Sequence, residues 1–438
     1  MEAYNLVSLS GIFALMVVAW AFSNNRRKIN WRVIFWGVVL QLALALIIFR
    51  LPAGLIFFNW INAVVIKLFS FAKEGMYFLF GPLAVAPGEV GPAGEKSLGF
   101  ILATQALPTI IFFAALMGLL YHIRLMPLIV RAFARVFTKL MRISGAESFC
   151  SASNIFVGIE SALTIRPYLD GMTRSELCTI LTAGMATIAS TVLALYVTFL
   201  HQQFPTIAGH LVSASILSAP AAIVMSKLLF PEIEKPPTLG EVVEGEYQPK
   251  GTWIEAIIYG ATEGVKLLVG IAAMLLAFLG LLAMANWLLS GLGNWIGSMI
   301  GSQLNLSLQG ILSYIFYPLT VLVGVPLADA PKIAHILGER TIVTEVVAYQ
   351  HLAGYIDNGV LQHPRSIVIA TYCLCGFAHI ASLAIFVGGI AAIVPKRAAD
   401  LARFGFRALF AATLACLMTG AVAGVFFRPG VTILLGGP

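Results

Sequence analysis

Two glutamates, Glu160 and Glu345, lie inside long stretches of apolar residues. A charged side chain at the centre of a bilayer costs roughly 2.5–3.5 kcal/mol on insertion scales, so such residues usually pair with one another or line a transport path. A single carboxylate of this kind could instead reach the membrane surface or be neutralised by a nearby arginine. Because two occur in similar surroundings, we expect both to belong to a binding site.

Asn154 and Thr187 place neutral oxygen atoms in the same apolar regions. A hard cation such as sodium is bound by several oxygens, which transporters take from side chains and from the unwound backbone of discontinuous helices. The simpler interpretation is that Asn154 caps a helix and that Thr187 bonds to its own helix. The residues alone leave both interpretations open.

Two further polar positions have a structural and a functional interpretation. His379 is either a core histidine with satisfied hydrogen bonds or a side chain that faces a cavity. Glu263 and Lys266 are three residues apart, on one face of a predicted helix. They form either a simple intrahelical ion pair or a pair that includes a substrate-facing lysine.

The sequence contains no motif of an intramembrane enzyme. Neither H-E-x-x-H nor G-x-S-x-G occurs, and the seven histidines are not at metal-ligand spacing. The five cysteines lie in or beside apolar segments and indicate neither a disulfide framework nor a metal site. We therefore expect no enzymatic activity and no cofactor. A membrane enzyme or sensor that uses Glu160, Glu345 and His379 for acid–base chemistry is the weaker alternative.

The composition shows which elements must position these residues. Only 11% of the 438 residues are charged and 59% are hydrophobic, whereas a soluble domain has roughly 25% charged residues. Apolar runs of about 20 residues are long enough to cross a bilayer. We expect an all-α polytopic membrane protein with spanning helices near residues 4–23, 33–50, 100–121, 175–201, 208–230, 253–288, 366–394 and 404–428.

Basic residues indicate the orientation. The first apolar run has no basic flank before it and no cleavage site after it, which predicts a retained helix. The short basic segment R-R-K-I-N-W-R follows and belongs on the cytoplasmic side. Both termini are thus predicted outside a plasma membrane. The basic amphipathic segment 126–145 is expected to lie in the cytoplasmic interface. The net charge of +7 follows from this pattern, so nucleic acid is not an expected partner.

An internal repeat surrounds the two glutamates. Segments 147–172 and 338–363 are apolar but are interrupted by polar residues, glycine and proline, and each precedes a related helix. Met185-Ala-Thr-Ile-Ala-Ser190 aligns with Phe377-Ala-His-Ile-Ala-Ser382. Interrupted duplicated segments indicate a transporter site near the bilayer midplane, and non-helical backbone at that depth must be buried or line a cavity. We interpret both segments as re-entrant hairpins, each followed by a partly unwound helix.

This interpretation divides the chain into five parts. They are a mainly scaffold part with the interfacial helix (1–142), the first hairpin and its unwound helix (143–202), a part that contains the acidic loop 231–250 (203–335), the second hairpin and its unwound helix (336–394), and a final scaffold helix (395–438).

From about residue 95 to residue 428, the chain resembles the concentrative nucleoside transporters. The matching segments are LPTIIFFAALMGLLYHI, AESFCSASNIFVG, TIRPYL, GMATIAS, GVPLADA, TEVVAY, CLCGFAHIAS and GGIAAIVPKRAADLARFG. Each segment is moderately specific, and their order makes the resemblance highly specific.

The resemblance implies eight spanning helices, interfacial helices and two re-entrant hairpins in an inverted repeat. It also implies a homotrimer in the lipid bilayer that imports nucleosides by an elevator movement, coupled to sodium. The implied sodium ligands are the Asn154 side chain, the Val157 carbonyl, the Thr187 hydroxyl and the Ile188 carbonyl. The implied substrate contacts are Gly158, Glu160, Val192, Glu345, Phe377, His379 and Ser382.

The chain departs from the family pattern around the expected substrate. The family usually reads G-Q-T-E in the first hairpin, whereas this chain reads Gly158-Ile159-Glu160 and is one residue shorter. His379 and Thr344 replace two asparagines, and Lys266 and Gly270 replace residues that are often Gln and Asn. We expect Glu160 and Lys266 to face the base. The substrate could also be a modified nucleoside or another polar ribosyl compound, with proton coupling as an alternative to sodium.

Overall fold

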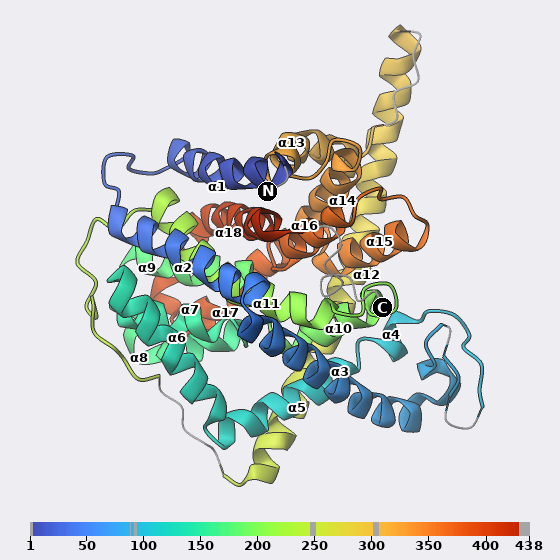
Figure 1. Ribbon diagram of the computed structural model, residues 1–438, viewed down its shortest axis with the longest axis horizontal. Helices are drawn as coiled ribbons and strands as arrows, with labels where there is room; N and C mark the ends of the chain where they lie inside the picture. The colour runs from blue at the N-terminus through green and yellow to red at the C-terminus, as the bar shows by residue number, and fades with distance from the viewer. Residues whose placement is uncertain (1–2, 88, 92–93, 246–250, 301–305, 429–438) are drawn as a thin grey trace.

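The computed structural model describes residues 3–87, 89–91, 94–245, 251–300 and 306–428, which are almost entirely helical (Figure 1). The elements in chain order are α1 (Ala3–Ala21), α2 (Trp31–Arg50), α3 (Pro52–Phe80), η1 (Gly81–Ala84), α4 (Leu102–Gln105), α5 (Thr109–His122), α6 (Leu125–Met141), α7 (Gly145–Ser153), η2 (Ile159–Ile165), α8 (Arg166–Leu169), α9 (Arg174–Ala186), α10 (Ser190–Leu200), α11 (Ile207–Leu229), α12 (Trp253–Ile300), α13 (Leu308–Leu322), α14 (Ala330–Ile342), α15 (Glu345–Asp357), α16 (Pro364–Leu374), α17 (Ile380–Ile393), η3 (Pro395–Arg397) and α18 (Ala398–Phe426).

Eight helical segments of the described chain are long and apolar enough to cross a membrane, which confirms the predicted fold class. One of these eight segments, α3, was not predicted from the sequence. Its apolar pattern is interrupted by Lys67, Lys73 and Glu74. The Lys73 charge is met by Glu89, whose Oε1 lies 2.6 Å from Lys73 Nζ. Segment 366–394, which was counted as a span, is divided between α16 and α17.

Both helices that follow the interrupted segments are broken, as predicted. The first break separates α9 from α10 at residues 187–189, and the second separates α16 from α17 at residues 375–379. In the first break, the Ser190 N–H donates to the Phe156 carbonyl in the preceding hairpin (2.8 Å) and not to its own helix. Tertiary contacts with the hairpin therefore stabilise the break.

The two interrupted segments form helical hairpins. The first consists of α7, a turn, η2 and α8, and the second consists of α14 and α15. The second hairpin begins at Ala330, so the predicted starts of the segment at 338 and of the domain at 336 were too late. Pro331 occupies the first turn of α14, where its missing N–H costs no hydrogen bond.

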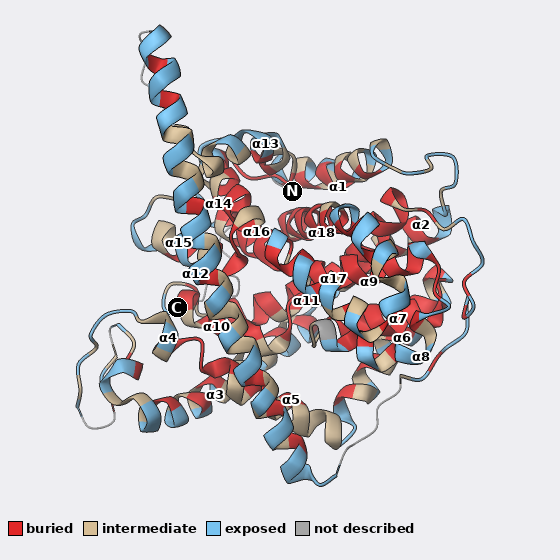
Figure 2. Cartoon of the chain, turned by 180° about the vertical axis from the view of Figure 1, so that it is seen from behind, coloured by how far each residue is buried: buried red, intermediate tan, exposed pale blue. Residues whose placement is uncertain are grey.

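The core lies along α9, α11 and α18, which are nearly fully buried (Figure 2). Helix α18 packs against α1, α9, α11 and α16. Helix α12 is mostly exposed and packs mainly on α5, and its 48 residues extend beyond the rest of the molecule in Figure 1. At 1.5 Å per residue it is about 72 Å long, so it continues well past the predicted end at residue 288.

The first hairpin is fixed at its base by two sets of contacts. The Thr238 hydroxyl, in the loop after α11, lies 2.8 Å from the Ser144 hydroxyl, and the Gly145 N–H donates to the Thr238 carbonyl. Lys227 Nζ, at the end of α11, lies 2.7 Å from Glu147 Oε1, and both side chains are almost completely buried. The described part of the acidic loop therefore packs against the hairpin and does not extend freely from the protein.

Candidate functional site

The hairpins and the broken helices are arranged with the symmetry of a repeat. The first arm of each hairpin packs on the first half of its own broken helix, α7 on α9 and α14 on α16. The second half of each broken helix packs on the other hairpin, α10 on α15 and α17 on η2. The hairpins and both breaks therefore form one connected centre.

Asn154 closes the first arm of hairpin 1, where its side chain is fully buried and fixed in orientation. Its Nδ2 donates to the Cys150 carbonyl (3.1 Å), and its Oδ1 accepts from the Ser161 hydroxyl (3.0 Å). The second oxygen lone pair of Oδ1 remains for another partner. A fixed amide oxygen of this kind suits a cation site.

The turn after Asn154 lies against the first helix break. Ser215 on α11 donates to the Ile155 carbonyl (2.8 Å) and approaches the Ile188 carbonyl (3.4 Å). The Thr187 hydroxyl donates to the Ala183 carbonyl (2.8 Å), which leaves its oxygen free to accept or to coordinate. The predicted sodium ligands in the turn and in the break are thus brought to neighbouring backbone segments.

Glu345 begins α15, and buried partners meet both of its oxygens. Oε1 accepts from the Tyr196 hydroxyl (2.6 Å), and Oε2 lies 2.7 Å from His379 Nε2. His379 Nε2 also lies 2.8 Å from the Ser382 hydroxyl. Three of the predicted substrate residues therefore form one connected polar group.

The position of His379 as the cap of α17 defines its tautomer. Its Nδ1 accepts from the Ser382 N–H (3.2 Å), which requires an unprotonated Nδ1 and places the proton of a neutral imidazole on Nε2. Nε2 then lies beside both the Ser382 hydroxyl and the Glu345 carboxylate. An asparagine at this position would cap the helix in the same way, so the replacement preserves the helix and changes the group presented to the site.

The other predicted substrate residues are spread over the surrounding elements. Val192 is buried on α10, and Phe377 is half-buried in the second break. Gly158 and Glu160 lie in hairpin 1, where Glu160 is exposed.

Lys266 lies on the exposed helix α12, and its Nζ lies 2.7 Å from Glu263 Oε1. The Lys266 side chain is 68% exposed, which favours the interpretation of Glu263 and Lys266 as a simple intrahelical ion pair. The pair lies within α12 and is not part of the Glu345 group.

Several residues of the site were not predicted from the sequence. Tyr196 is a buried aromatic residue in an apolar helix, and its ring stacks on Tyr349 at a centroid distance of 4.7 Å. Thr344 was noted only as a departure from the family motif, yet its buried hydroxyl makes no hydrogen bond within the described chain. A donor left free beside Glu345 is suited to a substrate. No signal in the sequence indicated Tyr196, because its partner Glu345 is 149 residues away along the chain.

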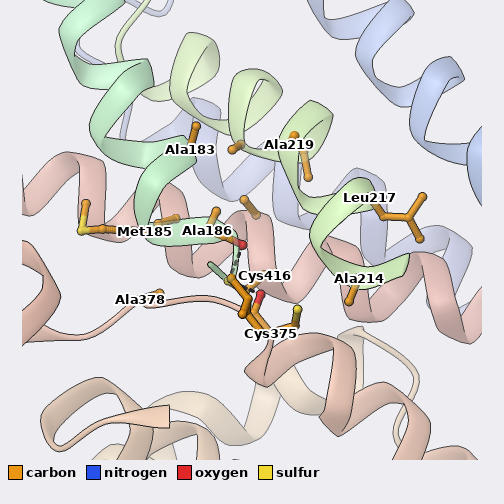
Figure 3. Close-up of a cluster of buried hydrophobic side chains, with 14 of the residues drawn as sticks. Ala183, Met185, Ala186, Ala214, Leu217, Ala219, Cys375, Ala378 and Cys416 are labelled. Atoms are coloured by element: carbon orange, nitrogen blue, oxygen red, sulfur yellow. Dashed lines mark hydrogen bonds between the residues drawn. The ribbon is translucent and has the colours of Figure 1, made fainter. Parts of the chain in front are cut away.

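Cys416 of α18 lies between the two helix breaks (Figure 3). Its thiol donates to the Ala186 carbonyl at the first break (3.7 Å) and approaches the Cys375 carbonyl at the second (3.8 Å). A Cβ atom on Gly376 would lie 2.6 Å from the Cys416 sulfur and 2.7 Å from the Ala186 oxygen. The breaks are therefore in direct contact, and only glycine fits at position 376.

Replacing Gly376 with alanine should separate the breaks, because the Ala186 oxygen belongs to the backbone. We expect a loss of about 1–3 kcal/mol in stability, typical of overpacking. The thermal unfolding midpoint measures this effect. Gly388→Ala on α17 is the control, since no atom lies within 4 Å of its added Cβ. Equal effects of the two variants would contradict the prediction.

A multi-pass helical protein in which two hairpins meet the breaks of two discontinuous helices has the architecture of a secondary active transporter. Sequence profiles of the family match three regions. "Na+ dependent nucleoside transporter N-terminus" matches residues 10–83, "Nucleoside recognition" matches residues 103–203 and "Na+ dependent nucleoside transporter C-terminus" matches residues 210–424. The chain belongs to the family of Na+-dependent nucleoside transporters. Its members are transporters and not enzymes, as the sequence predicted.

Individual relatives are similar over nearly the whole chain. It is 39% identical to solute carrier family 28 member 3 of Mus musculus over 98% of its length, but it covers 60% of that protein. It is 35% identical to an uncharacterized transporter of Haemophilus influenzae, with coverage of 98% of this chain and 99% of the relative. The chain thus spans about 60% of the length of the Mus musculus protein and nearly the full length of the Haemophilus influenzae protein.

Solved structures of the transporter CNTnw share the fold. CNTnw in an inward-facing substrate-bound state matches with a TM-score of 0.85 at 33% identity, covering 97% of this chain and 98% of that chain. A CNTnw variant in the intermediate 1 state matches with a TM-score of 0.86 at 33% identity, covering 98% and 100%.

Proposed function

We propose that the protein is a sodium-coupled symporter that imports nucleosides. The observation that carries this proposal is the contact between the hairpin 1 turn and the first helix break, bridged by Ser215. The proposed sodium ligands are the Asn154 and Thr187 side-chain oxygens and the Val157 and Ile188 carbonyls. Sodium bound there orders the hairpin and raises substrate affinity by linkage.

The substrate is held by the Glu345 group. The carboxylate accepts hydrogen bonds from the ribose hydroxyls, and His379 and Ser382 contribute further polar contacts. Gly158, Val192 and Phe377 form the less polar surroundings. The shortened Gly158-Ile159-Glu160 turn and the histidine at position 379 favour a modified nucleoside as the second candidate.

Transport follows an elevator movement in which the hairpins and broken helices move together. Helix α18 moves with them, because it packs against α9, α16 and α17. This assignment differs from the sequence-based division, which placed residues 395–438 in the scaffold. Helix α12 packs mainly on α5 and belongs to the fixed part. The protein works as a homotrimer in the plasma membrane, with both termini outside.

Uptake by reconstituted vesicles tests the function. An imposed inward sodium gradient should drive accumulation of labelled uridine or adenosine, and a proton gradient alone should not. Uptake of neither compound, with competition only by other ribosyl compounds, would support the second candidate. No solute flux under either gradient would contradict transport.

Replacing Thr187 with valine should weaken sodium binding selectively, because it removes one proposed ligand and preserves side-chain shape. We expect the sodium concentration for half-maximal uptake to rise about tenfold, equivalent to about 1.4 kcal/mol. The substrate KM at saturating sodium should change little. Thr182→Val is the control, since the Thr182 hydroxyl also donates within α9, to the Cys178 carbonyl. An equal sodium shift in both variants would contradict a ligand role.

Replacing Glu160 with glutamine should change which nucleosides compete best, because the exposed carboxylate is proposed to face the base. The measurement is the inhibition of labelled nucleoside uptake by a panel of unlabelled nucleosides. Lys266→Ala separately tests the lysine. If Glu160→Gln and Lys266→Ala both leave the ranking unchanged, neither residue contacts the base.

A further inference from the structure

Tyr196 is a completely buried tyrosine on α10, the second half of the first broken helix. Its hydroxyl donates to Glu345 Oε1 at 2.6 Å. Distances of about 2.5–2.7 Å are typical of a hydroxyl that donates to a carboxylate, which is one of the stronger hydrogen bonds in proteins. A glutamate side chain has several rotatable bonds and loses much of its freedom when one oxygen is held in this way. The hydrogen bond therefore orients the Glu345 carboxylate.

The ring of Tyr196 is held in place by a second tyrosine. Glu345 and Tyr349 are four residues apart on α15, so their side chains lie on the same face of that helix. The Tyr196 ring stacks on the Tyr349 ring, with centroids 4.7 Å apart and an angle of 28° between the ring planes. The Tyr349 hydroxyl in turn donates to the Thr371 carbonyl of α16 at 2.8 Å. The second hairpin thus holds Tyr196 both at its ring and at its hydroxyl.

Helix α10 connects this contact to the first helix break. Two of the proposed sodium ligands, Thr187 and Ile188, lie in the break directly before α10. The Ser190 N–H at the start of α10 donates to the Phe156 carbonyl of hairpin 1 at 2.8 Å. Tyr196 follows in the same uninterrupted helix, about 9 Å further along its axis. A shift at the start of α10 is therefore transmitted to the Tyr196 hydroxyl.

The two oxygens of the Glu345 carboxylate contact different repeats. Oε1 is bonded to Tyr196 of the first repeat, and Oε2 lies 2.7 Å from Nε2 of His379, which caps α17 in the second repeat. Of these two contacts, the one with Tyr196 joins Glu345 to the repeat in which sodium is proposed to bind. The proposed ligands of the ion and of the substrate are different residues, so a connection of this kind is needed for one site to affect the other.

We propose that Tyr196 is a positioning residue through which sodium at the first helix break sets the orientation of the Glu345 carboxylate. Sodium fixes the start of α10, and the Tyr196 hydroxyl then holds Glu345 Oε1 so that the carboxylate is presented to the ribose hydroxyls. Without the ion, the start of α10 is less constrained, and the Tyr196 hydroxyl holds the carboxylate less firmly. Substrate affinity therefore rises when sodium binds. This inference rests on the proposed sodium-coupled function.

Tyr196→Phe tests the inference, because it removes the hydroxyl and preserves the ring that stacks on Tyr349. The measurement is the Kd of labelled uridine or adenosine, whichever the vesicles accumulate, for the purified protein without sodium and at saturating sodium. In the unmodified protein, sodium should lower this Kd about tenfold, within the usual range for coupled sites. In Tyr196→Phe, the Kd without sodium should be unchanged, and sodium should lower it less than about twofold. The sodium Kd without substrate should stay within about threefold of that of the unmodified protein.

Tyr349→Phe is the matched control, because it removes an equally buried hydroxyl from the same ring stack. It loses the hydrogen bond to the Thr371 carbonyl and keeps the one between Tyr196 and Glu345, so sodium should still lower the nucleoside Kd about tenfold. The same decrease in Tyr196→Phe would overturn the inference. Equal weakening of nucleoside binding with and without sodium would also overturn it, because Tyr196 would then orient Glu345 independently of the ion.

A measurement on the unmodified protein applies if Tyr196→Phe does not fold. Adding sodium without substrate should change the carboxylate stretching bands in an infrared difference spectrum, and Glu345→Gln should lack this change. The same sodium-induced change in both proteins would overturn the inference, because it would not arise from Glu345. If sodium has no effect on nucleoside binding or uptake by the unmodified protein, the proposed function itself is contradicted, and the inference with it.

Discussion

Replacing Glu345 with glutamine should reduce nucleoside uptake about a hundredfold or more. Hydrogen bonds to a charged group contribute about 1.5–3 kcal/mol each, and two ribose hydroxyls would lose such an acceptor. The substitution also removes the negative charge that faces His379, whose Nε2 lies 2.7 Å from Glu345 Oε2. The measurement is kcat/KM for uptake at saturating sodium.

Glu339→Gln provides the matched control for Glu345. Glu339 is also a buried carboxylate of the second hairpin, but its partner is His351, at 2.5 Å. The control should retain uptake within about an order of magnitude, because glutamine keeps the shape of the buried side chain and the His351 side chain that loses the charged partner is 48% exposed to solvent. If Glu345→Gln retained nearly full uptake, Glu345 would not hold the substrate.

Replacing Lys227 with methionine should cause the largest loss of stability. Removing one partner of a buried ion pair costs about 3–5 kcal/mol, because the other charge is left buried and unpaired. Lys227 Nζ also donates to the Ser175 hydroxyl (3.0 Å) and lies 3.5 Å from Glu232 Oε2, so three elements lose contacts. The decrease is measured as the thermal unfolding midpoint in detergent.

The double variant Lys227→Met with Glu147→Gln separates charge from packing. If the unpaired Glu147 charge causes the loss, neutralising it should restore a large part of the stability. Lys73→Met is the control for a partly exposed pair and should cost at most about 1 kcal/mol. A loss in Lys73→Met as large as in Lys227→Met would contradict an effect of burial.

The fold was largely predictable because membrane helices leave a direct signal. Apolar runs of sufficient length indicated most spanning helices, and the duplicated GMATIAS and GFAHIAS segments located both breaks to within a few residues. Helix α3 was missed because its lysines and glutamate interrupt the apolar run. The Lys73 partner, Glu89, lies in a later segment, and sequence spacing does not reveal such a contact.

The site was predictable where polar residues were conspicuous in apolar segments. Glu345, His379 and Ser382 do form one group. Tyr196 and Ser215 could not be recognised, because a tyrosine or serine in a membrane helix is common and their partners are more than 25 residues away. Such partners are determined by tertiary packing.

The anchored base of the first hairpin limits how that hairpin can open. Thr238 holds Ser144 and Gly145, and Lys227 holds Glu147, all at the start of the hairpin. At the tip, the turn carbonyls accept hydrogen bonds from Ser190 and Ser215, and η2 packs on α17. In the proposed transport cycle, opening would therefore be a rotation about the fixed base, with an amplitude that increases along the arm toward the proposed ion site.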